Sequence, residues 1–309
     1  MEYILITGGS GLVGSAIKSL YGEKYSNYNI LYLSSNECDL TNYEKSFNYL
    51  KNYNIKYVIH LAAYVGGLYK NMNFKVDMLE KNTLININIL KICNNLNINN
   101  VISCLSTCVF PDKTEYPINE DMLHNGPPHY SNDAYAYAKR LLETLSKSYN
   151  HQYERNYICI IPTNIYGEND NYSLENGHVI PSLIHKAYLS KLNNKSFIIR
   201  GSGKPLRQFI YSKDLARLII WVLFNYKYKE SIILSDKKEY TIQYIGEQIA
   251  QCFNLNDIVF DKNYSDGQFK KTADNSKLLA LCDFEFTDIE TGIHNSCNWF
   301  IENYDTCRK

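Results

Sequence analysis

The sequence predicts an α/β protein built on a doubly wound parallel sheet, with a second, smaller α/β lobe. Three observations predict this fold class. Short apolar strands alternate with helical patterns, a glycine-rich turn joins the first strand to the first helix, and the pattern becomes irregular after Pro162. A chain of 309 residues is long enough for one large α/β unit or for two lobes with their own cores.

Five runs in the first half have the composition of buried strands. They are continuously apolar, which is typical of strands covered on both faces of a parallel sheet. The predicted strands are Tyr3–Thr7, Asn29–Leu33, Tyr57–Leu61, Val101–Ser106 and Tyr157–Ile161. The predicted helices between them are Leu12–Leu20, Thr41–Asn52, Phe74–Leu96 and Ala134–Asn150. In such sheets, ligands bind beyond the carboxyl ends of the strands.

The region after Pro162 predicts a smaller lobe assembled from more than one segment. Tyr166–Gly177 is polar and loop-like, whereas Val179–Lys191, Asp214–Phe224 and Thr241–Phe253 have helical patterns and Phe197–Ile199 is a strand candidate. We assign residues 1–165 and 206–238 to the sheet domain, and residues 166–205 and 239–309 to the second domain.

Composition excludes several classes of partner. Thirty-two basic residues balance 32 acidic ones, so no global field attracts nucleic acid or an anionic membrane. The longest apolar run, Leu215–Phe224, is too short to span a bilayer, and the first strand leaves no room for a signal peptide. Nine cysteines at irregular spacing, without a Cys-x-x-Cys pair, predict neither a disulfide framework nor a metal site. We therefore expect a cytoplasmic protein.

A glycine-rich turn directly follows the first strand and opens a helix. Its glycines have the spacing G-x-x-G-x-x-G, which lets backbone N–H groups approach a pyrophosphate at the positive end of the helix. This arrangement predicts a dinucleotide site of the Rossmann type. The residues expected to contact the cofactor here are Gly8, Gly9, Ser10, Gly11, Leu12, Val13 and Gly14.

The second strand indicates which dinucleotide binds. A carboxylate at its tip would bind the ribose 2′-hydroxyl of NAD, but the strand ends in Ser34-Ser35 and Glu37 lies further on. Hydroxyl groups can hydrogen-bond a 2′-phosphate, so we expect NADP(H). Asp39 and Leu40 are expected to border the adenine, and the small residues of Leu61-Ala62-Ala63 to lie beneath the cofactor.

A Tyr-x-x-x-Lys sequence lies on the fourth predicted helix. Tyr135 and Lys139 are four residues apart and share a helix face, whereas Tyr137 does not. A cation beside a phenol lowers the phenol's pKa and suits it to proton transfer, and Lys139 could also hold the nicotinamide ribose. Ser106, at the end of the fourth predicted strand, is placed to hydrogen-bond a substrate carbonyl.

The order of glycine turn, serine and Tyr-x-x-x-Lys resembles that of the extended short-chain dehydrogenases/reductases. Further segments resemble the GDP-L-fucose synthase family among them, and its eukaryotic form more than its bacterial one. They are Leu105–Pro111, His60–Ala63, Val65–Gly67, Asn125–His129, Ile161–Asn164, Gly177–Pro181 and Ser265–Lys271. The resemblance extends from about residue 3 to about residue 300. It implies conversion of GDP-4-keto-6-deoxy-D-mannose to GDP-L-fucose by epimerisation at C3 and C5 and NADPH-dependent reduction at C4.

The same resemblance implies roles for further residues. Cys108 and His178 would exchange the protons at C3 and C5, while Ser106 and Tyr135 would hold the enolate oxygen. Further cofactor contacts would come from Pro162, Thr163, Asn164, Ile165, Lys139 and His178. Substrate contacts would come from Lys186, Arg200, Arg207, Asp266 and Lys271. Arg200 departs from the family, in which an aromatic residue often precedes the Gly-x-Gly segment. Homodimers are expected by analogy.

Two other functions remain open at the level of sequence. One is another nucleotide-sugar epimerase or dehydratase that recycles tightly held NAD. The other is a non-catalytic dinucleotide-binding regulator, although such proteins commonly lose the Tyr or the Lys, and both are present here. Stoichiometric consumption of NADPH with a 4-keto sugar distinguishes these functions.

Overall fold

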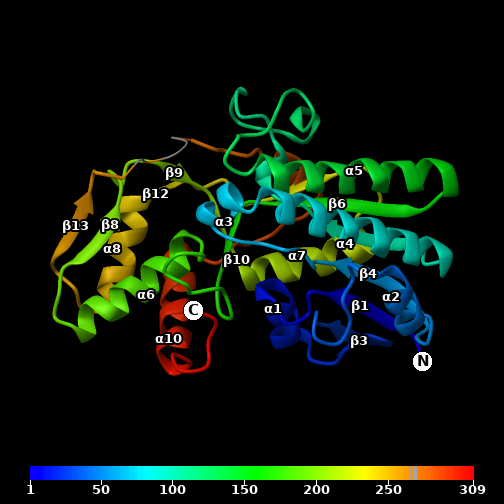
Figure 1. Cartoon of the computed structure of the whole chain (residues 1–309), viewed down its shortest axis with the longest axis horizontal. Helices are drawn as coiled ribbons and strands as arrows, with labels where there is room; N and C mark the ends of the chain where they lie inside the picture. The colour runs from blue at the N-terminus through cyan, green and yellow to red at the C-terminus, as the bar shows by residue number, and fades with distance from the viewer. Residues whose placement is uncertain (265, 267–269) are drawn as a thin grey trace.

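The computed structural model describes residues 1–264, 266 and 270–309 of the chain. Figure 1 shows a large sheet domain, which carries the N-terminus, beside a smaller lobe that contains α6, α8 and α10. Within the described residues, no helix combines the length and the apolar character that crossing a membrane requires.

The main sheet confirms the predicted fold class. Its order is β11-β6-β5-β4-β1-β3-β2, and every pairing is parallel except that of the edge strand β2. The strands are β1 (Tyr3–Thr7), β2 (Lys24–Tyr25), β3 (Tyr28–Leu33), β4 (Ile55–His60), β5 (Asn100–Cys104), β6 (Asn156–Pro162) and β11 (Ile232–Leu234).

Helices cover both faces of this sheet. Leu5 of β1 packs into one core with residues of α2, α4 and α5, whereas Ile4 and Ile6 pack into a second core with α1 and α7. Because each strand buries both faces, its sequence is continuously apolar. The helices are α1 (Leu12–Tyr21), α2 (Tyr43–Leu50), α3 (Leu68–Asn73), α4 (Lys75–Asn95), α5 (Asp133–Tyr153) and α7 (Ser212–Asn225).

Three features of the sheet domain differ from the sequence prediction. The fourth predicted strand ends at Cys104 instead of Ser106, because Ser106 caps a 3-10 turn over Thr107–Val109. The edge strands β2 and β11 were not predicted, because two or three residues are too short to show a period. A second 3-10 turn spans Glu120–Met122.

The smaller lobe has a core of its own, which includes Ile184, Phe197, Ile249 and Phe300. Its short strands pair as β7 (Asn164–Tyr166) with β10 (Phe209–Tyr211), β8 (Phe197–Arg200) with β13 (Ile258–Asp261), and β9 (Leu206–Arg207) with β12 (Tyr240–Thr241). The helices of this lobe are α6 (Val179–Leu192), α8 (Ile242–Cys252) and α10 (Ile289–Glu302), whereas α9 (Ser276–Leu281) packs against β11 of the main sheet. The domain boundaries assigned from the sequence remain a prediction.

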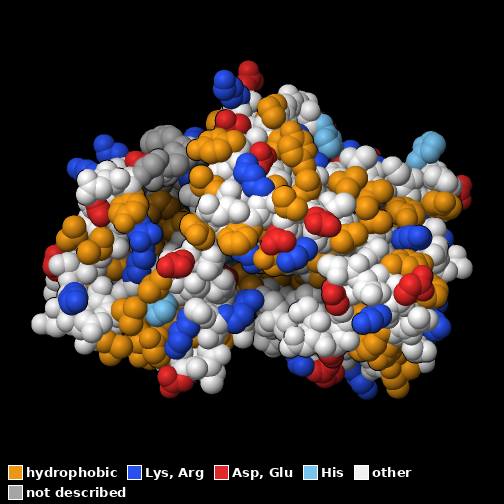
Figure 2. Space-filling model, in the orientation of Figure 1, with side chains coloured by type: hydrophobic (Ala, Val, Ile, Leu, Met, Phe, Trp, Pro, Cys, Tyr) orange, Lys and Arg blue, Asp and Glu red, His pale blue; other side chains and the backbone are white. Residues whose placement is uncertain are grey.

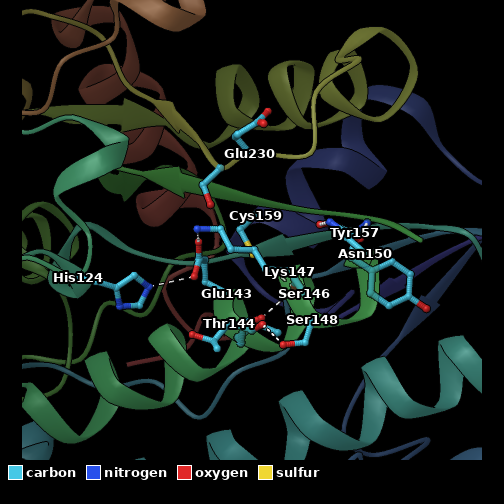
Figure 3. Close-up of polar contacts among 12 residues, drawn as sticks. His124, Glu143, Thr144, Ser146, Lys147, Ser148, Asn150, Tyr157, Cys159 and Glu230 are labelled. Atoms are coloured by element: carbon cyan, nitrogen blue, oxygen red, sulfur yellow. Dashed lines mark hydrogen bonds and ion pairs between the residues drawn. The ribbon is translucent and has the colours of Figure 1, made fainter. Parts of the chain in front are cut away.

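Polar contacts fix α5, the helix that carries Tyr135 and Lys139. Figure 3 shows the buried Glu143 carboxylate between His124 Nε2, at 3.0 Å, and Lys147 Nζ, at 2.5 Å. Further along the helix, Asn150 exchanges two hydrogen bonds with the backbone of Tyr157 on β6, at 2.8 and 2.7 Å. These contacts hold α5 against the sheet and so set the position of the Tyr-x-x-x-Lys pair.

Candidate active site

The glycine turn has the geometry of an anion cradle. Gly8 has φ +71°, and a Cβ at Gly14 would lie 2.6 Å from the carbonyl oxygens of Gly8 and Gly9. Among the described residues, no side chain caps α1 at its N-cap, Gly11. The N–H groups of a helix's first turn have no partner within the helix, so those of Leu12, Val13 and Gly14 can bind a pyrophosphate.

The tip of β3 differs from the sequence prediction. Both the N–H and the hydroxyl of Ser34 donate to Oε2 of Glu37, at 2.8 and 2.7 Å. The expectation that no carboxylate stands at this tip is therefore wrong, because the turn after β3 folds Glu37 back onto Ser34. These hydrogen bonds lower the pKa of Glu37 and keep it ionised. Ser35 is exposed, and the Asp39 carboxylate accepts from the N–H and hydroxyl of Thr41.

A buried hydrogen-bond chain, missed by the sequence analysis, connects the glycine turn to α5. Thr7 Oγ1 lies 2.8 Å from His60 Nδ1, and His60 Nε2 lies 3.1 Å from Asn86 Oδ1. Asn86 Nδ2 then donates to the carbonyl of Ala138, at 3.1 Å, next to Lys139. Burial lowers the pKa of His60 to about 3, so its ring is neutral. The signal available in the sequence was a histidine and an asparagine within apolar elements.

The carboxyl end of β5 brings the Ser106, Cys108, Tyr135 and Lys139 side chains to one place. Lys139 is buried and its Nζ donates to the carbonyl of Cys104, at 2.7 Å, while lying 5.6 Å from the centroid of the Tyr135 ring. Ser106 Oγ accepts from the N–H of Cys108, at 3.4 Å. Tyr137 points away into solvent, as expected from its position on the helix.

Burial dominates the electrostatics of this cluster. It raises the pKa of Tyr135 well above its ordinary value, and the neighbouring thiols Cys108 and Cys104 raise it further. The expectation that Lys139 lowers the pKa of Tyr135 is therefore wrong for this structure. Burial also raises the pKa of Cys108, although the ammonium of Lys271 opposes this shift more than any other group. Lys271, which is expected to contact substrate, therefore lies close enough to the Cys108 thiol for its charge to lower the thiol's pKa.

The cofactor segments after β4 and β6 are positioned by backbone contacts. Ala62 N–H donates to Thr7 Oγ1, at 3.2 Å, which holds Leu61–Ala63 beside the glycine turn. After β6, Asn164 Nδ2 donates to the carbonyl of Gln208, at 2.7 Å. Asn164 also begins β7, which pairs with β10. Thr163 is buried between Pro162 and these contacts, and within the described residues its hydroxyl has no hydrogen-bond partner.

His178 is carried by a different element from the residues around Cys108. It is the exposed N-cap residue of α6, and its charged neighbour is Asp170 on the preceding loop. Asp170 is buried, and among the described residues its Oδ2 has no hydrogen-bond partner. Burial raises its pKa to about 6. The sequence analysis missed Asp170, because it assigned Tyr166–Gly177 only as a polar loop.

We predict that Asp170→Asn stabilises the protein at pH 7. The folded state raises the pKa from an ordinary 3.8 to about 6, so ionising this group costs about 3 kcal/mol. The protonated Asp170 therefore contributes fully to the free energy of unfolding below pH 4, and this contribution is lost as the pH rises through 6. Urea unfolding of the wild type should therefore show stability falling over that interval, and the variant should lack this component. Equal pH dependence in both proteins would contradict the prediction.

Four of the five predicted substrate residues line one pocket. Lys186, Arg200, Arg207 and Asp266 surround a cavity of about 200 Å³, together with Val179 beside His178. Burial lowers the pKa of Lys186, and the nearby Arg200 adds to that shift. Three cations around one cavity favour a diphosphate. Of the predicted segment Ser265–Lys271, residues 265 and 267–269 lie outside the described residues.

Comparisons with known proteins place this geometry among nucleotide-sugar enzymes. Residues 4–234 match the NAD dependent epimerase/dehydratase family. The chain is 48% identical to GDP-L-fucose synthase of Dictyostelium discoideum over 99% of this chain and 97% of that protein. It is 32% identical to GDP-L-colitose synthase of Yersinia pseudotuberculosis, covering 96% of this chain and 97% of the relative. A GDP-L-fucose synthetase structure from Naegleria fowleri bound to NADP superimposes with a TM-score of 0.95, at 45% identity, over 100% of this chain and 95% of that one.

Proposed function

This chain belongs to the NAD dependent epimerase/dehydratase family, and we propose that it converts GDP-4-keto-6-deoxy-D-mannose to GDP-L-fucose with NADPH. The observation that carries the proposal is the meeting of Ser106, Cys108, Tyr135 and Lys139 at the sheet edge that carries the glycine turn. A separate pocket rich in cations, around Lys186 and Arg207, suits the diphosphate of the substrate.

The proposed chemistry begins at the C4 ketone. Ser106 and Tyr135 hydrogen-bond its oxygen, which makes the protons at C3 and C5 acidic because both are α to the carbonyl. Cys108 removes each proton as a thiolate, and the charge of Lys271 favours that form. His178 returns a proton from the opposite face and so inverts the centre. The enolate oxygen is held throughout by the two hydroxyl donors.

The reduction at C4 relies on the same cluster. NADPH, when bound, supplies the hydride for C4. Tyr135 donates its proton to the ketone oxygen. The buried Lys139 lies beside the Tyr135 ring, where its Nζ donates to the Cys104 carbonyl. The glycine turn fits such a cofactor, because Gly8 and Gly14 occupy positions that would not accept a Cβ and the first turn of α1 presents its N–H groups.

The direct test of this function follows NADPH at 340 nm. Purified protein given GDP-4-keto-6-deoxy-D-mannose should consume NADPH and sugar in equal amounts and release GDP-L-fucose. An enzyme that recycles tightly held NAD would interconvert sugars without net consumption of added NADPH. A regulator would bind the cofactor and transform no sugar. Either outcome would contradict the proposal.

We predict that Glu37→Gln tightens NADPH binding by about 5-fold, because a carboxylate at the tip of β3 repels the 2′-phosphate. NADH, which lacks this phosphate, should bind the variant with nearly unchanged affinity. Ser35→Asp adds a second carboxylate and should shift preference toward NADH. Fluorescence titration with both cofactors measures the ratio, and Glu302→Gln, at the exposed end of α10, is the control. An unchanged NADPH affinity in Glu37→Gln would show that Glu37 does not act on the bound cofactor.

We propose further that the protein is a cytoplasmic homodimer that associates through α4 and α5. Apolar side chains gather over the face of α3, α4 and α5 seen in Figure 2. The exposed ones include Met72, Phe74, Val76, Leu79, Leu84, Ile87 and Tyr137. Several exposed apolar side chains on neighbouring helices favour association with a second copy.

All nine cysteines are free thiols, in keeping with a reducing compartment.

The dimer can be tested by sedimentation. The mass of the wild-type protein measured by sedimentation should be twice the chain mass of 35.9 kDa. The double variant Leu79→Glu/Leu84→Glu should sediment as a monomer, because two charges on each copy oppose burial of this face. Ile301→Glu places one charge on a comparably exposed apolar residue of α10 and should leave the dimer intact. A wild-type monomer at micromolar concentration would exclude the proposed assembly.

A further inference from the structure

Arg200 and Tyr264 form a stacked pair at the edge of the substrate pocket. The guanidinium carbon of Arg200 lies 4.5 Å from the centroid of the Tyr264 ring. Arg200 and Lys186 line both the cavity of about 200 Å³ and a larger, open one of about 940 Å³, which Tyr264 also lines. The pair therefore stands where the cationic pocket opens into a wider space.

Backbone pairing presets this stack. Arg200, at the end of β8, is the register partner of Asp261, at the end of β13, and Gly201 N–H donates to the Asp261 carbonyl at 2.9 Å. Tyr264 follows one turn later, where its N–H donates to the same carbonyl at 3.4 Å. Both residues are thus carried by paired strand ends, so their alignment does not depend on a ligand.

Asp266 holds the two segments together from the other side. Its carboxylate accepts from the N–H of Ser202, at 2.6 Å, and from the Ser202 hydroxyl, at 2.7 Å. A Cβ at Gly201, which has φ +93°, would lie 2.6 Å from Asp266 Oδ1. Because Ser202 donates to both oxygens, Asp266 positions the loop after Arg200. Its contact with substrate, expected from the sequence, stays a prediction.

We propose that Tyr264 is a positioning residue that braces the Arg200 guanidinium so that its edge N–H groups face the guanine base of the nucleotide sugar. The inference rests on the proposed function and names the residue that recognises its base. Here the aromatic ring comes from another strand end and lies beneath a planar cation. A guanidinium can stack on a ring with its face and still donate hydrogen bonds from its edge.

This arrangement also selects the base. The N–H groups at the edge of Arg200 can donate to the O6 and N7 acceptors of guanine, the pairing that arginine makes most often. Adenine presents an amino donor in place of O6, so the same edge would face a donor. With Lys186 and Arg207 around the smaller cavity for the diphosphate, the base would lie outward, beside the edge of the braced guanidinium.

Titration calorimetry with GDP and ADP tests the proposal without requiring turnover. Arg200→Ala should weaken GDP binding by about 10- to 30-fold, and Tyr264→Ala by about 5-fold, because bidentate contact with the base and cation–π bracing contribute on this scale. Tyr264→Phe keeps a ring and should bind GDP like the wild type. In the Arg200→Ala background, Tyr264→Ala should weaken GDP binding almost no further. The preference for GDP over ADP should fall in both alanine variants.

Two controls separate bracing from general damage. Tyr153→Ala removes a tyrosine that is 46% exposed, the same fraction as Tyr264, from the far end of α5, and should leave GDP affinity unchanged. NADPH affinity should stay at the wild-type value in Tyr264→Ala, since the glycine turn lies in the other domain. In turnover assays, Tyr264→Ala should raise KM and leave kcat unchanged, as expected for a residue that acts only through binding.

Three results would overturn the inference. One is a Tyr264→Ala variant that binds GDP as tightly as the wild type while Arg200→Ala binds weakly. The second is an equal loss from removing Tyr264 with and without Arg200, which would mean that the ring acts independently. The third is a wild type that shows no preference for GDP over ADP. Failure of the proposed function is distinguishable, because it would appear as absent NADPH consumption by the wild type.

Discussion

Replacing Cys108 with alanine is expected to slow the incorporation of deuterium from heavy water into the 4-keto sugar by about 10²–10⁴-fold. The thiol lies beside Tyr135 and Lys139 at the carboxyl end of β5, where a C4 ketone would be held, and Lys271 opposes the effect of burial on its pKa. Alanine removes the base and preserves the backbone of the 3-10 turn. Mass spectrometry of the sugar recovered without NADPH measures the exchange directly.

A matched control is available on the same segment. Cys104 is a second thiol at the end of β5, and burial raises its pKa to about 11. Cys104→Ala should exchange deuterium at nearly the wild-type rate, because the raised pKa of Cys104 keeps its thiol protonated at neutral pH. His178→Asn should still exchange hydrogen through Cys108 but yield little inverted sugar. If Cys108→Ala exchanges at the wild-type rate, the protein is a reductase or an NAD-recycling epimerase, and Cys108 is not its base.

Tyr135→Phe is expected to reduce NADPH oxidation by about 10²–10⁴-fold while deuterium exchange continues. The phenol is the only group proposed to protonate the C4 oxygen during reduction, whereas Ser106 can still polarise the ketone during proton exchange. Burial raises the pKa of Tyr135, so the phenol stays protonated across the neutral range and acts as an acid. The variant should therefore accumulate deuterated, epimerised 4-keto sugar.

The comparison that tests this prediction lies two residues away. Tyr137 is exposed on the opposite side of α5, and Tyr137→Phe should leave both exchange and reduction unchanged. Stopped-flow absorbance gives the rate of NADPH oxidation, and mass spectrometry gives the label at C3 and C5. A Tyr135→Phe variant that loses exchange and reduction to the same extent would show that the two reactions are not separable at this residue.

Local sequence alone determined the sheet and the residue types at its edge. Continuous apolar runs predicted β1, β3, β4, β5 and β6 to within about two residues at each end, because burial on both faces leaves a pattern readable in any short window. The glycine spacing predicted the turn before α1, since few other sequences fit so tight a strand-to-helix turn. The four-residue spacing of Tyr135 and Lys139 likewise placed both on one face of α5, because helix geometry fixes that relation.

The tertiary structure decided what these residues meet. The return of Glu37 to Ser34, the charge of Lys271 near Cys108 and the ring of Tyr264 beneath Arg200 all join segments whose distance in space no local pattern records. The same holds for the pKa values, because the sequence shows Lys139 near Tyr135 but not the burial that outweighs it. Desolvation and long-range contact depend on the packing of the whole chain, whereas spacing and periodicity depend only on neighbours along it.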